Sequence, residues 1–414
     1  MELQYARYKN EHKPKQPSRL KPVMLILTAL LMLAASYTAL ALYRDPPVPI
    51  LTAVALPGRQ ASPVQLPWPA SGQAAIGSLD DGLLAASGAN ELPAPMASLT
   101  KVITALVILD KVPYEAGSQG QSYTLTGSDA ALASSYSAKN GVVLPVRSGQ
   151  TITQHQAMQA MLISSANNIA DSLAVHVFGS VDAYVTQAND FVKSKGLSRT
   201  VVADASGFSA QSISTPSELV LLGRLALQDT VIRSIVSQKE ADLGDFGKVK
   251  TTNGLLAGQG VIGIKTGTTD EAGSCLLFAS VHELEPAYKV TLIGVITGGT
   301  SAGSVIRDAR ALLAAASAQF SKAELAKAGT TAGTLTVSWG GSSNIVLSED
   351  LAVYAWKGKA ISPTVKLELP DNLGQAAQAA GYAEAAGSTS SRVQLVTSQA
   401  LGQPPWLWRL RHAY

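Results

Sequence analysis

The sequence is poor in cysteine and histidine, with one and five of them among 414 residues. A single cysteine excludes an internal disulfide, and its place in the apolar run CLLFASV predicts that Cys275 is a buried strand residue and not a reactive thiol. The histidines show no metal-ligand spacing, so we expect no metal site; they lie at positions 12, 155, 176, 282 and 412.

Charged residues are also scarce, at 15% of the chain, and the formal net charge is only +3. Part of that positive charge lies in the first residues, so no basic groove for nucleic acid is expected. Hydrophobic residues make up 46% of the sequence, which is enough for a substantial core. A chain of this length is expected to hold two folded units with appendages.

One uncharged apolar run, residues 22–43, is long enough to span a bilayer as a helix. The preceding residues 1–21 carry six basic side chains, which predicts a cytoplasmic amino-terminal segment and a single-pass anchor in the membrane. The alternative is a cleaved signal peptide, because Ala39-Leu40-Ala41 matches a cleavage signal. In either case the rest of the chain is expected outside the cytoplasm.

Four segments follow the apolar run. Residues 44–72 hold seven prolines and predict an extended linker. Residues 73–325 contain helix and strand patterns, whereas residues 328–402 contain short strands broken by Gly, Ser and Asp turns, which predicts a separate small all-β domain. Residues 403–414 are rich in Trp and Arg, which suits either a membrane interface or packing on the β domain.

The larger unit shows two sources of strands and several helices. The turn signal Asp80-Asp81-Gly82 predicts a hairpin over 74–87, and three strand-like runs predict a meander over 260–297. Residues 117–150, rich in Gly, Ser and Thr, are expected to form loops with short strands. Apolar spacing predicts helices over 98–110, 154–163, from about 168, and over 181–195, 215–228 and 304–320.

Ser98-Leu99-Thr100-Lys101 opens one of these predicted helices. At positions i and i+3 a hydroxyl and an amine lie on one face, so Lys101 could take the proton of Ser98 and make it a nucleophile. The pattern alone is weak. A second copy, Ser18 to Lys21, lies on the cytoplasmic flank of the apolar run, outside any fold, and is set aside.

Ser165-Ala166-Asn167 follows a predicted helix at a turn. The hydroxyl could relay a proton and the amide could hold a substrate carbonyl. A helix cap is the simpler interpretation of Ser165 alone, and Ser342-Ser343-Asn344 has the same pattern.

Lys265-Thr266-Gly267 lies on a predicted strand ahead of a turn. Lys265 offers a fixed positive charge to a carboxylate, Thr266 offers a hydroxyl, and Gly267 lets a substrate approach the backbone closely. An ordinary strand end is the alternative interpretation.

Two competing motifs predict other enzymes. Gly258-x-Gly260-x-x-Gly263 matches a dinucleotide fingerprint but opens a strand, so no helix N-terminus would face a pyrophosphate. Ser301, in Gly-Thr-Ser-Ala-Gly, matches a hydrolase nucleophile elbow between a strand and a helix. That chemistry needs a later histidine, and the only one is His412 in the basic tail.

The three motifs together, in this order, match the set of penicillin-binding proteins and β-lactamases. Four stretches are similar to the low-molecular-mass penicillin-binding proteins, the serine-type D-alanyl-D-alanine carboxypeptidases of peptidase family S11: PMASLTKVITALVILD, MLISSANNIADSLA, DASGFS with ISTPSELVLLGRLAL, and TTNGLL with GVIGIKTGTTDEAGSCLLFAS. The resemblance covers roughly residues 72–320, and the β segment after 328 resembles that family's C-terminal domain. It departs at Asn168-Ile169, where the family usually has Asp-Ala.

The resemblance implies an α/β (α+β) fold, with an antiparallel sheet flanked by helices and followed by a small all-β domain. It implies that Ser98 attacks a D-Ala-D-Ala bond of peptidoglycan stem peptides, Lys101 is its base and Ser165 passes the proton to the leaving amine. Asn167, Lys265, Thr266, Gly267 and Thr268 would bind the substrate, with the N–H groups of Ser98 and Thr268 as oxyanion hole.

The same resemblance implies inhibition by β-lactam antibiotics and no need for a metal or organic cofactor. A β-lactamase or a DD-endopeptidase would carry the same motifs. A protein of another class, a catalytically silent cell-wall-binding protein that works through the β domain, is the remaining alternative.

Overall fold

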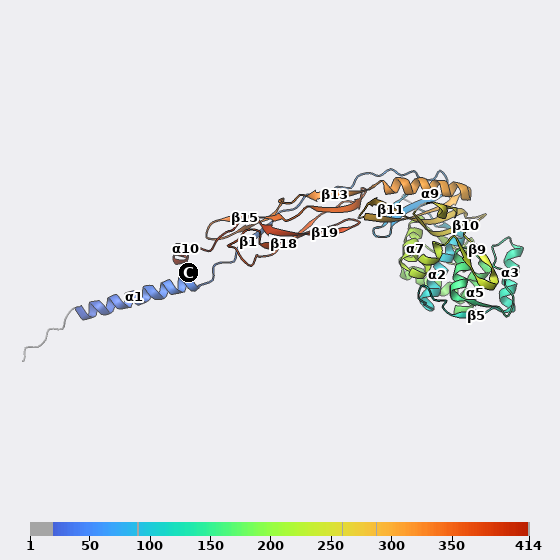
Figure 1. The fold of residues 1–414 in the computed structure, drawn as a ribbon, viewed down its shortest axis with the longest axis horizontal. Helices are drawn as coiled ribbons and strands as arrows, with labels where there is room; N and C mark the ends of the chain where they lie inside the picture. The colour runs from blue at the N-terminus through green and yellow to red at the C-terminus, as the bar shows by residue number, and fades with distance from the viewer. Residues whose placement is uncertain (1–19, 89–90, 259, 287, 413–414) are drawn as a thin grey trace, which may run out of the picture.

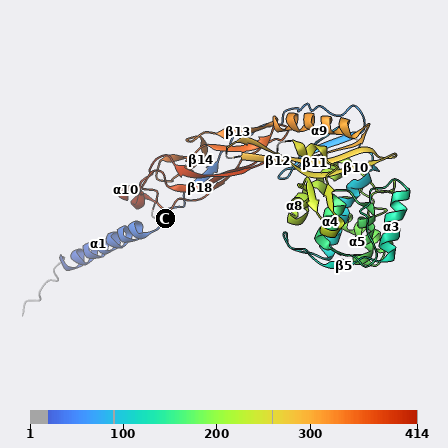
Figure 2. The same ribbon diagram turned by 45° about the vertical axis from the view of Figure 1, so that its right-hand side comes forward.

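The computed structural model describes residues 20–88, 91–258, 260–286 and 288–412. The molecule is elongated: the helix α1 (Leu20–Tyr43) lies at one end, a β-rich unit in the middle and a mixed α/β domain at the far end (Figure 1). The view turned by 45° gives the same order (Figure 2). The predicted cytoplasmic segment 1–21 lies almost wholly outside the described residues.

The α/β domain is built on a five-stranded antiparallel sheet of order β10-β11-β12-β2-β3. The predicted hairpin supplies two of these strands and the predicted meander three, which confirms the mixed fold: β2 (Gln73–Ser78), β3 (Gly82–Ala86), β10 (Val261–Thr269), β11 (Gly273–Glu285) and β12 (Tyr288–Gly299).

Helices cover both faces of this sheet, which explains the continuous apolar runs within its central strands β11 and β12. Leu277 and neighbours on one face pack with the helix α7 (Pro216–Gln228). Leu276 and Phe278 on the other face pack with the helix α9 (Ala302–Ser317). Alternate residues of a strand point to opposite faces, so a strand buried on both sides loses its polar alternation.

A helical subdomain packs beside the α7 face. The 3₁₀ turn Ala97–Leu99 leads into its central helix, so the predicted helix over 98–110 begins two residues later than expected. Its helices are α2 (Thr100–Lys111), α3 (Gly127–Ala138), α4 (Gln154–Leu162), α5 (Asn167–Phe178), α6 (Val181–Ser194) and α8 (Thr230–Val236). Three two-stranded ladders complete it: β4 (Ala94–Pro95) with β7 (Ile213–Ser214), β5 (Ser122–Thr124) with β6 (Thr151–Thr153), and β8 (Glu240–Asp242) with β9 (Lys248–Lys250).

The expectation of loops over 117–150 is wrong at α3, a helix of three turns. Its start is fixed by a capping box: the Thr126 side chain bonds to the backbone N–H of Asp129, and the Asp129 carboxylate accepts from the backbone N–H of Thr126. Apart from Leu132 and Tyr136, small residues fill the rest of the helix, and Asp129 is its one buried residue. Because no apolar stripe faces a core, the usual helical pattern is absent.

The β-rich unit contains a six-stranded sheet of order β1-β14-β15-β19-β18-β17 and a two-stranded ladder of β13 and β16. The carboxy-terminal strands are β13 (Phe320–Ala326), β14 (Thr331–Thr336), β15 (Ser342–Leu347), β16 (Leu351–Trp356), β17 (Thr364–Leu367), β18 (Ala379–Ala386) and β19 (Ser390–Thr397). The first of them begins before residue 328, where the β domain was predicted to start.

The Pro-rich segment 44–72 supplies the remaining strand, β1 (Ile50–Ala53), which pairs antiparallel with β14 from Ile50↔Thr336 to Ala53↔Gly333. Further along, the backbones of Arg59 and Ile361 exchange two hydrogen bonds. The segment is therefore part of the β-rich unit and not a free spacer. β1 contains no proline, so all of its residues keep the backbone N–H groups that pairing at this sheet edge requires.

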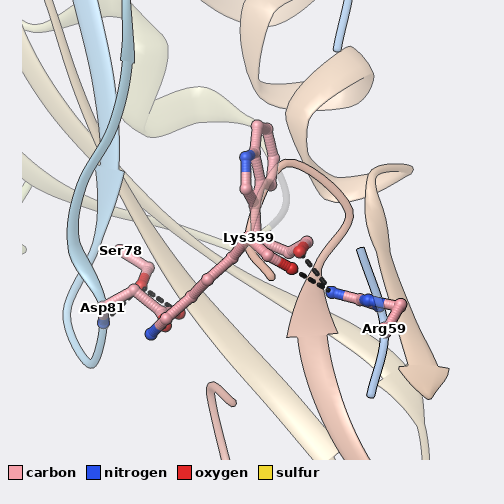
Figure 3. A network of polar contacts seen from close by, with 5 residues as sticks. Arg59, Ser78, Asp81 and Lys359 are labelled. Atoms are coloured by element: carbon pink, nitrogen blue, oxygen red, sulfur yellow. Dashed lines mark hydrogen bonds and ion pairs between the residues drawn. The ribbon is translucent and has the colours of Figure 1, made fainter. Parts of the chain in front are cut away.

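Polar contacts join the two units where the β2–β3 turn meets the loop after β16 (Figure 3). The Lys359 ammonium lies 3.1 Å from a carboxylate oxygen of Asp81, whose side chain is 2% exposed. Arg59 donates to the backbone oxygens of Trp356 and Lys359. Trp356 also packs edge-on against Phe320, with ring centroids 5.2 Å apart, in the same apolar cluster as α9.

The tail forms a short helix, α10 (Trp406–Arg411), beside the end of α1. The Tyr37 hydroxyl donates to the Leu410 carbonyl at 2.6 Å, and Arg409 donates to the Leu42 carbonyl at 2.8 Å. Trp408 packs on Trp339 of the β-rich unit. The tail thus packs on protein, as one of the two interpretations expected.

Candidate active site

Ser98 lies in a tight turn between the sheet and the helical subdomain. The preceding Ala97 has φ of 46°, a left-handed conformation that non-glycine residues rarely adopt. Such strain persists only where the surroundings enforce it, and it clusters at functional sites. Here the turn sets Ser98 at the start of α2, with Lys101 one turn further on the same side.

Lys101 is completely buried and has three polar neighbours. Its Nζ lies 2.8 Å from Ser98 Oγ, 2.6 Å from Asn167 Oδ1 and 2.7 Å from the carbonyl oxygen of Ser206. The last two atoms can only accept hydrogen bonds. A neutral amine would direct its two hydrogens to them, which leaves its lone pair facing the hydroxyl of Ser98.

The protonation of Lys101 is set by opposing effects. Burial lowers its pKa to about 7, while the negative charges of Asp204 and Asp171 act in the opposite direction. A lysine with this pKa is neutral in a substantial fraction of molecules near neutral pH. Lys101 can therefore accept a proton without a metal or a histidine beside it.

The second predicted motif lies in the turn between α4 and α5. The structure brings Asn167 into contact with Lys101, and Ser165 precedes it in a left-handed conformation with φ of 69°. Both side chains are nearly buried, at 6% exposure. The Asn167 N–H donates to the Val142 carbonyl, so the loop after α3 supports this turn.

Asn168, where the sequence departs from the family pattern, is fully buried and points away from Lys101 toward the same loop. Its Oδ1 accepts from the Leu144 N–H and its Nδ2 donates to the Leu144 carbonyl, both at 2.9 Å. A carboxylate could not make the second bond, because it has no donor. The Asn168 amide, with one acceptor and one donor, therefore satisfies both backbone groups of Leu144.

The third predicted motif lies on β10, against the Ser98 turn. A methyl group on Gly267 would lie 2.8 Å from the Ser98 nitrogen and 2.9 Å from Ala97 Cβ, so only glycine allows this approach. Lys265 is buried, and burial and the nearby charge of Lys101 lower its pKa well below the usual range. Thr266 is hydrogen-bonded through its hydroxyl to Thr252, and Thr268 follows on the same strand.

Four polar residues around Lys101 were given no role from the sequence. Ser206 and Asp204 lie in DASGFS, a stretch that carried the resemblance, and Asp171 lies on α5. Tyr136 comes from α3, the helix that the sequence did not predict. The Tyr136 hydroxyl donates to Asp171 at 2.7 Å and contacts Ser206 Oγ at 3.1 Å.

The competing candidates lie elsewhere. Ser301 is the N-cap of α9, where its hydroxyl accepts from the Ser304 N–H, and Ser343 lies on β15 of the β-rich unit. Among the described residues, no group of three or more His, Cys, Asp or Glu side chains could hold a metal ion. Cys275 is buried on β11, as expected.

An antiparallel sheet with a helical subdomain, and a serine–lysine contact at their junction, define the class of serine DD-peptidases and β-lactamases. A family model described as D-alanyl-D-alanine carboxypeptidase matches residues 66–296, more than half of the chain. The protein therefore belongs to peptidase family S11, as its motifs indicated.

Relatives within the family carry two activities in their names. The chain is 28% identical over 241 residues to a D-alanyl-D-alanine endopeptidase of Escherichia coli, which covers 56% of this chain and 74% of that protein. It is 27% identical over 263 residues to the D-alanyl-D-alanine carboxypeptidase DacA of the same species, which covers 62% of this chain and 63% of DacA.

Solved structures support the fold. The Streptomyces K15 DD-transpeptidase matches 61% of this chain and 98% of its own, with a TM-score of 0.54 and 24% identity. The D-alanyl-D-alanine carboxypeptidase DacD of Francisella tularensis matches 83% of this chain and 96% of its own, with a TM-score of 0.57 and 17% identity. The second match extends beyond the α/β domain into the β-rich unit.

Proposed function

We propose that this protein is a serine-type D-Ala-D-Ala carboxypeptidase that removes the terminal D-alanine from peptidoglycan stem peptides through an acyl-enzyme. The observation that carries the proposal is the 2.8 Å contact between Ser98 Oγ and the buried Lys101 Nζ. A serine hydroxyl is a poor nucleophile until a base lies within hydrogen-bond reach, and Lys101 is such a base.

Acylation forms one bond and breaks another. Ser98 Oγ attacks the carbonyl carbon between the two D-alanines as its proton moves to neutral Lys101. The C–N bond then breaks, and the released amine takes a proton that Lys101 delivers with the help of Ser165. The N–H groups of Ser98 and Thr268 hold the negative oxygen of the tetrahedral intermediate.

Substrate binding is assigned to the strand side of the site. Lys265 and Thr266 would hold the terminal carboxylate of the substrate, and the amide of Asn167 would contact a substrate carbonyl. Gly267 keeps the strand close to the nucleophile. Water then hydrolyses the ester of Ser98 and regenerates the enzyme.

The test is labelling of the intact protein with a fluorescent penicillin, beside the variant Ser98→Ala. Penicillin is a β-lactam whose ring-opening acylates the same serine. We expect the wild type to be labelled and Ser98→Ala to remain unlabelled, with release of D-alanine from a pentapeptide lost in parallel. Labelling of Ser98→Ala would contradict the assignment. A folded wild type without labelling would favour a silent cell-wall-binding protein.

A second candidate is DD-endopeptidase activity, which the named relative at 28% identity favours. The two activities differ in the bond that is cut, and the same residues would cut both. Incubation with a stem pentapeptide and with a crosslinked dimer of stem peptides separates them by the products released. A β-lactamase would instead show turnover of penicillin in place of a lasting label.

We further propose that α1 is a single-pass anchor that places the folded part outside the cytoplasm. It is the one described helix long and apolar enough to cross a membrane. A reporter fused after residue 414 should be active only outside the cytoplasm. A soluble mature protein beginning near Leu42 would show instead that the segment is a cleaved signal.

A further inference from the structure

A buried carboxyl group, Asp171, lies beyond the residues that the proposed mechanism uses. It lies on α5, one turn after Asn167, and is 7% exposed. Its Oδ2 accepts from the Tyr136 hydroxyl, and its Oδ1 is buried without a hydrogen-bond partner. A buried carboxylate with an unpartnered oxygen is unfavourable, so this group needs an explanation.

Asp171 is linked to Lys101 through two side chains. Tyr136 contacts Ser206 Oγ, Ser206 Oγ in turn contacts Asp204 Oδ2 at 2.9 Å, and the Ser206 carbonyl accepts from Lys101. The chain of hydroxyl and carboxyl contacts therefore has three links: Asp171 to Tyr136, Tyr136 to Ser206, and Ser206 to Asp204.

Counting protons shows which carboxyl group carries one. Two hydroxyl groups supply two protons, so three links cannot all form when both acids are ionised. Asp204 also accepts from Ser212 Oγ and from the N–H groups of residues 207, 208 and 209, which stabilise a carboxylate. Asp171 has none of these donors. A proton on Asp171 reverses its bond with Tyr136 and completes the chain: Asp171 then donates to Tyr136, Tyr136 to Ser206 and Ser206 to Asp204.

We propose that Asp171 is a positioning residue for the acylation step, and that it shares one proton with Lys101. With the proton on Asp171, the hydrogen-bonded chain is complete and Lys101 is a neutral base. With the proton on Lys101, Asp171 is an anion whose charge holds it there and Ser98 has no base. This inference rests on the proposed function, because it assigns a regulator to that base.

The electrostatics of the buried groups agree with a shared proton. Burial raises the pKa of Asp171 to about 6, close to the value of about 7 for Lys101, and the charge of each group favours the charged form of the other, so the proton can reside on either one. Groups that face the pair from other elements are Tyr136 on α3, Tyr184 on α6, Asp204 and Lys265. Among these, Asp204 adds negative charge, whereas burial and the charge of Lys101 lower the pKa of Lys265 well below its usual value.

The test is the pH dependence of acylation by fluorescent penicillin, measured on the full-length protein and on Asp171→Asn. The amide keeps a donor for Tyr136 but removes the charge that raises the pKa of Lys101. The acidic limb of the rate should therefore move to lower pH, by roughly 0.5 unit. That shift is smaller than the 1–3 units caused by a charge in direct contact. The rate on the alkaline plateau should change little.

Two further variants keep the result interpretable. Tyr136→Phe leaves Asp171 with no donor, so Asp171 should stay protonated and the acidic limb should move in the same direction. If Asp171→Asn does not fold, this variant tests the role of Asp171 in its place. Asp129→Asn removes another buried carboxylate, which contacts Thr126 and His176 instead, and should leave the limb in place.

The outcomes separate the two proposals. An unshifted limb in Asp171→Asn and Tyr136→Phe, with wild-type labelling intact, overturns the role of Asp171 and leaves the proposed function standing. An equal shift in Asp129→Asn also overturns it, because any buried charge would then act alike. A wild type that is not labelled at any pH refutes the proposed function itself.

Discussion

The α/β domain and the β-rich unit differ in how they use buried polar groups. Around Ser98 the α/β domain buries two lysines and the acid Asp171, with Lys101 and Lys265 both at 1% exposure or less. In the β-rich unit, the ion pairs within the sheet, such as Arg392 with Glu384, lie on the exposed surface. Buried charges cost stability and are kept where chemistry needs shifted pKa values, whereas surface pairs contribute little. We therefore expect the chemistry to be confined to the α/β domain, with the β-rich unit positioning that domain.

Among substitutions that leave Ser98 in place, Lys101→Ala should have the largest effect on the rate of acylation. It removes the proposed base of Ser98, and loss of a general base typically lowers rates about a hundredfold to ten-thousandfold. The rate of acylation by penicillin measures it. Ser301→Ala, which alters a helix cap in the same domain, should leave acylation unchanged. A loss of D-alanine release in Ser301→Ala alone would move the active site to the β12–α9 turn.

Gly267→Ala should have the second-largest effect on the rate of acylation. The added methyl would lie 2.8 Å from the Ser98 nitrogen, so either β10 or the nucleophile turn must move. A misplacement of about 1 Å near reacting groups costs on the order of a hundredfold in rate. Gly127→Ala is the matched control, because its methyl would meet open space and its φ is not left-handed. Equal rates in the two variants would show that the approach of β10 is unimportant.

The pH dependence of acylation should follow Lys101. Its pKa is about 7 and the reactive form is the neutral amine, so the rate should rise with pH through this value. Well below it, each unit of pH should lower the rate about tenfold. Stopped-flow labelling between mildly acidic and mildly alkaline pH measures the limb. A rate that is flat across this range would exclude Lys101 as the titrating base.

Trp356→Ala tests whether the β-rich unit affects the stability of the protein without affecting acylation. The side chain is 3% exposed and packs with Phe320 under α9, so truncation should destabilise the protein by about 3–5 kcal/mol. Thermal unfolding measures the loss. Below the melting transition, acylation of Ser98 should remain within about twofold of wild type. A selective loss of acylation in folded protein would show that the two units are coupled in catalysis.

Lys359→Ala should have the smallest effect. The ion pair with Asp81 joins the units, but solvent screens the lysine, which is 46% exposed, and Asp81 keeps its hydrogen bond from the Ser78 hydroxyl, so we expect a loss of about 1 kcal/mol. A small drop in melting temperature with unchanged acylation is expected. A loss as large as that of Trp356→Ala would mean that the junction depends on charge more than on apolar packing.

The sequence predicted the sheet of the α/β domain. It also identified Ser98, Lys101 and Asn167 as candidate site residues, and the structure brings them into contact. It did so because local spacing places Ser98 and Lys101 on one face of a helix, and the three motifs carried the resemblance. Tyr136 and Asp171 were missed for a physical reason. Their contact joins α3, which has no apolar stripe, to a helix that lies more than 30 residues later, and no local pattern records such a pairing.

The pairing of β1 with β14 was missed for a related reason and has a consequence for biosynthesis. Ile50 lies opposite Thr336, so the whole α/β domain is an insertion between two neighbouring strands of one sheet. As the chain emerges from its amino terminus, β1 has no partner until the inserted domain is complete. Non-local pairings form slowly, and domains generally fold as units. We therefore expect the inserted domain to fold first and the β-rich unit to close last, with an unpaired strand exposed in between.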